Sequence, residues 1–451
     1  MKILVLANHY NTLRIFRREL LQALSAAGHD VVISIPPCDE ENRKILESYG
    51  TRVIFTAFER RGKNPLADLK LLEEYKRLIK AENPDKVITY TIKCNIYGAT
   101  ACKKYKVPCY VNVTGLGSTF QGHGFMRKLV SAMYKISLNK AEKVFFENEG
   151  NRDTLVNDGI VRAEQTVVMP GAGVNLTEFA PVPYPDNDDI MRFLFVGRIM
   201  REKGVDEYFS AIKRIRKEYP NTEFDFIGWY EDNYEAQVKQ LEAEEYIRFH
   251  GFQADVKPFI AAAHCSVLPS WHEGMSNTLL ESAAMCRPLI TSNIHGCMEA
   301  VEDGKNGYLI EVKNEESLYQ AITRFIKLSY EEKRAMGLAG RARMEKVFDK
   351  NKVVDTTMKV SFRRYTSMIN LWTVFAVSMI LAYMSEKNIL TLRHRNGKTV
   401  DLALIAMCIV MSLYCGLRTS FNDTETYISG FNSAPTPAEY LATNPNLLEN
   451  P

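Results

Sequence analysis

The chain has 451 residues, of which 46% are hydrophobic and 25% are charged. This composition excludes a disordered chain and supplies enough apolar side chains for two or three domains, each with its own core. The formal net charge is only +3, so the overall charge balance does not require a nucleic acid as partner.

The N-terminal half alternates short apolar runs with amphipathic stretches, a pattern that predicts β-α-β units and a parallel sheet. The predicted strands are residues 3–7, 31–35, 86–89, 110–113 and 144–146. The first of them follows a single lysine and precedes no cleavage site, which indicates a strand and not a signal peptide. Predicted helices cover residues 15–27, before Gly28, and residues 66–81, before Asn83 and Pro84.

A proline-rich break at residues 180–189, APVPYPDNDD, predicts a domain linker. The alternation restarts after it and predicts a second parallel sheet, to about residue 350. The predicted strands of this sheet are residues 192–196, 223–227, 247–250, 265–268, 288–291 and 307–310. Nine cysteines are scattered along the chain without zinc-type spacing, and we expect them to be reduced thiols in a cytosolic protein.

Two apolar segments, residues 369–384 and 402–417, follow the second predicted sheet. Both are shorter than the ~20 residues of an untilted membrane helix, so buried or re-entrant helices are an alternative to membrane insertion. Insertion is the preferred interpretation. One span at 369–384 would however export a loop rich in Lys and Arg, against the positive-inside tendency.

Two carboxylates stand in the segment PSWHEGMSNTLLES. Glu273 precedes the loop Gly274-Met275-Ser276-Asn277, and Glu281 falls in the helix that this loop opens. Backbone N–H groups at the start of a helix suit a bound phosphate. Spacing alone favours two solvated acids, but the small residues after Glu281 favour a closely packed helix whose carboxylate faces a cleft. Two such acids would suit the hydroxyl groups of a sugar and of a ribose.

A second motif, FVGRIMREKG, lies where the first strand of the second sheet is predicted to end. Arg198 and Lys203 are candidates to hold a diphosphate, because a guanidinium engages two phosphate oxygens and an ammonium adds a point charge. A basic turn that ends at Gly204 is an equally good interpretation of this motif alone.

Together, G-R-x4-K-G at 197–204 and E-G-x6-E at 273–281 resemble the motifs of the retaining glycosyltransferases of family 4. ITYTIKCNIYGA at 88–99 and NVTGLGSTF at 112–120 are similar to the branch that makes capsules and lipid-linked oligosaccharides. The resemblance spans residues 1–365. It implies the α/β GT-B fold, in which two Rossmann-like domains face a cleft.

The resemblance implies an acceptor-binding domain at 1–180, a nucleotide-sugar-binding domain at 181–350 and a crossover helix at 351–365. The hydrophobic tail at 366–451, with one or two candidate membrane segments, is predicted from its apolar composition and lies outside the resemblance. The resemblance also implies site residues. Arg198, Lys203 and Glu273 would be catalytic, on the donor diphosphate and sugar. Donor-binding residues would be Glu281, on the ribose, with Gly197, Gly274, Met275, Ser276 and Asn277.

The implied donor is a UDP-sugar, a hexose or an N-acetylhexosamine, and the implied acceptor is a lipid-linked saccharide at the cytoplasmic face of the bacterial inner membrane. No metal or other cofactor is expected, and no nucleic acid. Asp186-Asn187-Asp188 matches a metal-binding D-x-D pattern, but a linker is a poor place for a metal site. No G-x-G-x-x-G occurs, which argues against a dehydrogenase.

Two departures from the family pattern concern the first domain. Asn8-His9-Tyr10-Asn11 replaces the usual Gly-Gly pair, and no histidine follows the fourth strand until His123, so we assign no catalytic histidine. The segment 127–143 is basic and amphipathic, and Arg14, Arg17 and Arg18 add charge nearby, which favours contact with anionic lipid over an ordinary solvated face.

The tail leaves other functions open. GLRTSFNDTETYISGF at 416–431 resembles the start of an exopolysaccharide polymerase, too short here for polymerase activity. An inactive membrane-associated scaffold is therefore one alternative to a transferase. A nucleotide-sugar epimerase or hydrolase on the same two-domain fold is another. Phe252, from its position alone, is expected near the nucleobase.

Overall fold

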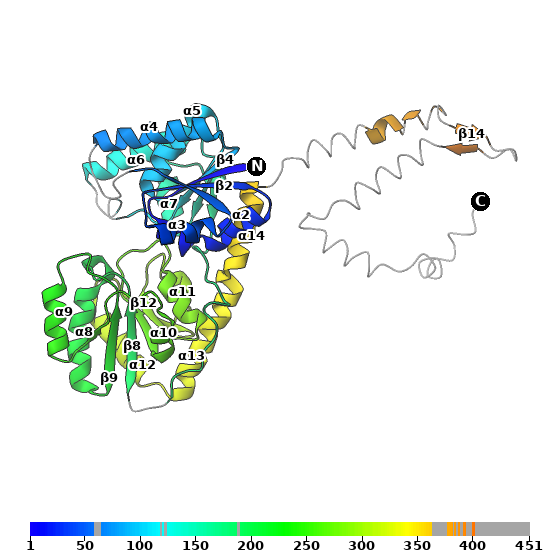
Figure 1. Cartoon of the computed structure of the whole chain (residues 1–451). Helices are drawn as coiled ribbons and strands as arrows, with labels where there is room; N and C mark the ends of the chain where they lie inside the picture. The colour runs from blue at the N-terminus through cyan, green and yellow to red at the C-terminus, as the bar shows by residue number, and fades with distance from the viewer. Residues whose placement is uncertain are drawn as a thin grey trace, which may run out of the picture. The chain divides into compact units, whose positions relative to one another are not determined.

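The computed structural model describes residues 1–57, 65–117, 120, 124–186, 190–362, 377–381, 383–384, 387, 391–393 and 399–401. The chain forms two units, Met1–Phe362 and Arg363–Pro451. Figure 1 shows the first unit as two α/β lobes. In the second unit, β14 (Thr391–Arg393) pairs antiparallel with β15 (Thr399–Asp401).

The N-terminal lobe is built on a parallel sheet of seven strands in the order β3-β2-β1-β4-β5-β6-β7. The strands are β1 (Lys2–Leu6), β2 (Asp30–Ile35), β3 (Thr51–Phe55), β4 (Lys86–Tyr90), β5 (Cys109–Val113), β6 (Lys143–Phe146) and β7 (Thr166–Val168). Its helices are α1 (Tyr10–Arg14), α2 (Arg18–Ala26), α3 (Glu40–Glu47), α4 (Pro65–Glu82), α5 (Ala99–Tyr105), α6 (Phe125–Leu138) and α7 (Glu149–Asn157).

Successive side chains of a strand point to opposite faces of this sheet, and helices cover both faces, so the side chains on both faces are buried. Ile3 and Val5 of β1 pack with α2, whereas Leu4 and Leu6 pack with α4, α5 and α6. The central strands therefore read as nearly continuous apolar runs, which is why the sequence pattern indicated a parallel sheet.

The C-terminal lobe has six parallel strands in the order β10-β9-β8-β11-β12-β13. They are β8 (Met191–Val196), β9 (Thr222–Ile227), β10 (Arg248–Phe249), β11 (Cys265–Leu268), β12 (Leu289–Ser292) and β13 (Gly307–Ile310). Its helices are α8 (Val205–Glu218), α9 (Glu235–Ala243), α10 (Lys257–Ala262), α11 (Asn277–Ala284), α12 (Glu315–Ile326) and α13 (Tyr330–Arg343).

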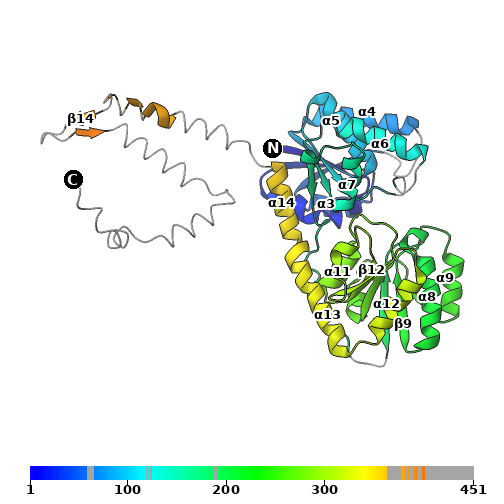
Figure 2. The same ribbon diagram turned by 180° about the vertical axis from the view of Figure 1, so that it is seen from behind.

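The helix α14 (Lys350–Phe362) leaves the C-terminal lobe and returns to the N-terminal lobe. Figure 2 shows it as a yellow helix that runs from α13 to the first sheet. Val353 of α14 packs into the same core as Leu20 and Leu21 of α2. The last helix of the unit thus ties the two lobes together.

The predicted fold class, α/β with two parallel Rossmann-like sheets, is confirmed. One predicted helix is wrong in detail: residues 15–27 do not form a single helix, because α1 ends at Arg14 and α2 begins at Arg18. The turn between them directs Arg17 into the protein. Strands β3 and β7 had no predicted counterpart. The domain boundaries drawn from the resemblance stay a prediction.

Within the residues that the structure describes, no helix is long and apolar enough to cross a membrane. The segment 402–417 and most of 369–384 lie outside those residues, as do 416–431 and His123. The cysteines of the described part are all free thiols.

Candidate functional site

Strand order brings the two sequence motifs together. Strands β8 and β11 are neighbours in the second sheet, and the loops that follow them leave the same edge. Gly204 has φ +70°, and a Cβ there would lie 2.1 Å from the carbonyl oxygen of Pro269. The N–H of Trp271 donates to the carbonyl of Glu202 at 2.9 Å. The loop after β8 therefore packs directly on the loop that carries Glu273.

Lys203 and Glu273 form an ion pair in this arrangement. The Lys203 ammonium donates to Glu273 Oε1, and the Ser270 hydroxyl donates to the same oxygen at 2.8 Å. The exposed fractions of the two side chains are 15% and 13%, so water screens the pair weakly. The second carboxylate oxygen of Glu273 is not used by these two donors, so it is available to a hydroxyl.

Arg198 lies in the same loop, but its side chain is more exposed than that of Lys203. Its guanidinium approaches Glu231 at 3.7 Å and is 36% exposed. Gly197, before it, is in close backbone contact with Gly228, where a Cβ would lie 1.8 Å from the Gly197 carbonyl oxygen. The backbone here is fixed by packing, while the arginine head can turn toward a ligand.

The loop Gly274-Met275-Ser276-Asn277 leads into α11, which Ser276 precedes without a side-chain capping bond. The predicted phosphate site needs one correction. The N–H of Ser276 donates to the carbonyl of Gly296 at 2.8 Å, so it is engaged within the protein. In the described part of the chain, no protein acceptor is bonded to the N–H of Met275 or Asn277. These two amides remain for an anion at the helix start.

Glu281 lies one turn into α11 and is half-buried. Burial raises the pKa of Glu281 to about 8, and the nearby Lys350 ammonium acts in the opposite direction. Near neutral pH this carboxyl is therefore largely protonated in the absence of ligand. The small residues after it face α13: a Cβ on Gly340 would lie 3.5 Å from the Ala283 Cβ. The close helix packing expected from the sequence is present.

A buried ion pair in the N-terminal lobe was missed from the sequence. Arg17 donates to Glu147 at 2.7 Å, with exposed side-chain fractions of 10% and 12%. The Arg17 guanidinium also lies over the Tyr90 ring, 4.9 Å from its centroid. Burial raises the pKa of Glu147, and Arg17 opposes that rise. The signal was a carboxylate and an amide, Glu147 and Asn148, directly after an apolar strand.

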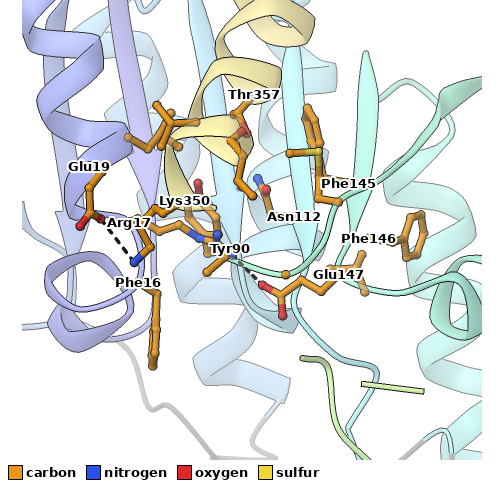
Figure 3. A pocket seen from close by; sticks show the side chains of 17 residues that line it. Phe16, Arg17, Glu19, Tyr90, Asn112, Phe145, Phe146, Glu147, Lys350 and Thr357 are labelled. Carbon is orange, nitrogen blue, oxygen red and sulfur yellow. Dashed lines mark hydrogen bonds and ion pairs between the residues drawn. The ribbon is translucent and has the colours of Figure 1, made fainter. Parts of the chain in front are cut away.

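Arg17, Tyr90 and Glu147 line a pocket at the carboxyl edge of the first sheet, between α2, α14 and β4 to β6 (Figure 3). The pocket has about 450 Å³ of empty space, including the part open to solvent. Lys350 of α14 lies 3.4 Å from Glu19 of α2, and both line the pocket. The charges of the pocket are thus paired with one another.

Two exposed aromatic side chains follow β9 and β10. Trp229 is 49% exposed and Phe252 is 65% exposed, and their ring centroids are 5.9 Å apart. Sequence reasoning singled out Phe252 alone, because the adjacency of β9 and β10 was unknown. Asp186 is the one member of the D-x-D pattern that the structure describes. No group of His, Cys, Asp or Glu suited to a metal ion occurs among the described residues.

Both lobes match glycosyltransferase families. Residues 2–148 match the family described as "Glycosyl transferase 4-like", and residues 191–327 match "Glycosyl transferases group 1". HepE of Anabaena, solved with UDP and glucose, superposes with a TM-score of 0.67 at 18% identity, over 81% of this chain and 100% of that one. The fold is therefore that of a GT-B enzyme. The chain is a glycosyltransferase, and its two lobes match the models of group 1 and 4-like glycosyl transferases.

Two curated relatives are similar in sequence. An N,N'-diacetylbacillosaminyl-diphospho-undecaprenol alpha-1,3-N-acetylgalactosaminyltransferase of Campylobacter jejuni is 26% identical over 363 residues, 76% of this chain and 94% of the relative. A UDP-Gal:alpha-D-GlcNAc-diphosphoundecaprenol alpha-1,3-galactosyltransferase of Escherichia coli is 27% identical over 288 residues, 57% of this chain and 70% of the relative.

Proposed function

We propose that this enzyme transfers a hexose or N-acetylhexosamine from a UDP-sugar to a saccharide linked to a polyprenyl diphosphate, with retention of anomeric configuration, during assembly of a surface glycan. The observation that carries the proposal is the contact between the loop of Arg198 and Lys203 and the loop of Glu273. The names of both relatives specify a diphospho-undecaprenol acceptor, which supports the acceptor class.

The charges of the site suit the departure of a nucleoside diphosphate. Lys203, Arg198 and the N–H groups at the start of α11 supply positive potential where the leaving-group charge develops. Glu273 already holds Lys203 in place, so little ordering remains to be done when the donor binds. Glu281 offers a largely protonated carboxyl, which can both donate to and accept from ribose hydroxyls.

The test is a transfer assay with the full chain, a set of UDP-sugars and a synthetic polyprenyl diphosphate saccharide. We expect one UDP-sugar to be consumed only when the acceptor is present, with a lipid-linked product whose linkage retains the configuration of the donor. Consumption of donor without acceptor would instead indicate the epimerase or hydrolase. Absence of both turnover and UDP binding would favour the inactive scaffold.

We further infer that α6 contacts the membrane that holds the acceptor. Met126, Leu129 and Ile136 are exposed at helical spacing, with Ile136 63% exposed, although α6 buries its opposite face through Tyr134 and Leu138. The helix contains no acidic residue, and Lys128 and Lys135 lie together along one side of the apolar stripe. An apolar stripe bordered by lysines suits the headgroup region of an anionic bilayer. The enzyme would then work at the cytoplasmic face of the inner membrane.

Part of the basic surface predicted from the sequence is wrong. Arg17 is buried against Glu147, and Arg18 donates to Glu19 at 2.8 Å and to Glu178 at 2.5 Å. Arg127, on α6, pairs with Asp158 at 3.1 Å. These arginines are engaged within the protein, so Lys128 and Lys135 are the basic residues of α6 that we assign to lipid.

Replacing Lys128 and Lys135 with Gln should weaken binding of the full chain to phosphatidylglycerol vesicles about 10-fold or more, because each cation near such a surface contributes about 1 kcal/mol. Sedimentation with vesicles measures this. The matched control replaces the exposed Lys239 and Lys327 of the C-terminal lobe with Gln and should bind as the wild type. Equal binding of both double variants would contradict the assignment of α6.

A further inference from the structure

Asn148 connects the two lobes at the loop that opens α11. It precedes α7, and its Oδ1 accepts a hydrogen bond from the N–H of Asn151 at 2.8 Å, which caps that helix. Its Nδ2 donates to the carbonyl oxygen of Gly274, in the other lobe. The side chain is buried, at 2% exposure. The amide oxygen therefore caps the helix α7, and the amide nitrogen binds the predicted donor loop.

Glycines allow a close approach of the two lobes at this point. A Cβ on Gly274 would lie 1.8 Å from the carbonyl oxygen of Thr114 and 3.1 Å from Glu147 Oε2. A Cβ on Gly150, in the first turn of α7, would lie 2.3 Å from the His295 ring. At Gly274 the two lobes meet backbone against backbone, and Asn148 supplies a side-chain hydrogen bond to the same loop.

The bond to Asn148 fixes the direction of one peptide group. In a trans peptide the C=O of one residue and the N–H of the next point in opposite directions. Because Asn148 holds the Gly274 carbonyl toward the N-terminal lobe, the N–H of Met275 points away from that lobe. This N–H has no protein acceptor among the described residues, whereas that of Ser276 is engaged by Gly296.

We propose that Asn148 is a positioning residue for donor binding. It holds the Gly274–Met275 peptide so that the Met275 N–H faces the donor diphosphate, and it does so only while the two lobes are docked. Donor binding and docking of the acceptor lobe are then coupled through one side chain. This inference depends on the proposed function, since it assigns a phosphate to the loop.

Asn148→Ser separates the two hydrogen bonds of the side chain, because serine is an equally good helix cap but has no amide nitrogen for Gly274. We expect UDP to bind about 10-fold more weakly by calorimetry, the loss typical of one charge-assisted hydrogen bond. We expect kcat/KM for transfer to fall by a similar factor, with a thermal midpoint within a few degrees of the wild type. Asn148→Asp keeps the cap but turns an oxygen toward the Gly274 carbonyl, and should bind UDP more weakly still.

The matched control is Asn314→Ser, at the cap of α12. There Asn314 Oδ1 accepts from the N–H of Ser317 at 2.9 Å, as Asn148 does in α7. This control should bind UDP as the wild type does. If Asn148→Ser bound UDP equally well, or lost affinity only as its thermal midpoint fell, the positioning role would be overturned. If the wild type bound no UDP, the proposed function itself would fail.

Discussion

Replacement of Lys203 with Ala is expected to lower kcat/KM for sugar transfer by about 10²- to 10³-fold, the usual effect of removing one group that stabilises developing negative charge. Lys203 is the one cation of the predicted donor site that is already held in place, through Glu273. Loss of Lys203 removes the positive charge that is proposed to face the diphosphate. It also leaves the largely buried carboxylate of Glu273 without its cation. Initial rates at varied UDP-sugar concentration measure the effect.

Lys239→Ala is the matched control, because Lys239 also pairs with a carboxylate, that of Glu235, at 2.7 Å, but on the exposed surface of α9. Its kinetics should equal those of the wild type. Calorimetry should show that Lys203→Ala is folded at the assay temperature. The lower kcat/KM then reflects the missing ammonium group and not unfolding. A kcat/KM within twofold of the wild type would rule out Lys203 as a ligand of the donor.

The largest effect on stability is expected at Arg287. This side chain is fully buried and lies shortly after the end of α11, and among the described residues no carboxylate lies within ion-pair distance of it. It donates instead to backbone carbonyl oxygens. Those within 3.0 Å belong to Ile260, Ala261 and Pro183. Burial lowers the pKa of Arg287 to about 10, so it stays charged at neutral pH.

Arg287→Met fills a similar volume but removes the donor of the Ala261 and Pro183 carbonyls, and it leaves the Ile260 carbonyl only a 3.3 Å bond from the N–H of Ala263. Each buried unsatisfied group costs about 1–3 kcal/mol, so we expect a loss of about 3–4 kcal/mol in the free energy of unfolding. We expect the thermal midpoint to fall. Because Pro183 belongs to the predicted linker, we also expect the linker to be held less firmly. Differential scanning calorimetry and limited proteolysis at residues 180–189 measure the two effects.

Arg334→Met serves as the control for Arg287→Met. Arg334 is 53% exposed and pairs with Glu331 at 3.3 Å on the surface of α13, and such exposed pairs contribute little. Its thermal midpoint should stay close to that of the wild type. A similar midpoint for Arg287→Met would show that water replaces the lost donors, contrary to the expected cost of a dry interior.

For the proposed donor site, the sequence named two residues that the structure brings together, and their roles stay a prediction. Lys203 and Glu273 were both named, and each stands just after an apolar run at the carboxyl edge of a parallel sheet. The order of the strands in the second sheet could not be predicted from the sequence. The direct pairing of Lys203 with Glu273, 70 residues apart, depends on β8 lying beside β11. The occupied N–H of Ser276 was equally hidden, because its acceptor, Gly296, follows the next strand.

By itself, the sequence determined the two parallel sheets, since alternation of apolar residues and glycine-bearing turns are local properties, and it supplied the prediction that the loops of Lys203 and Glu273 bind the donor. The tertiary structure alone decided which groups of the N-terminal lobe face those loops. The Arg17–Glu147 pair joins residues 130 apart, and the Asn148–Gly274 bond joins residues 126 apart in two lobes. Such contacts exist only after each sheet has folded and the lobes have docked, and no local pattern encodes them.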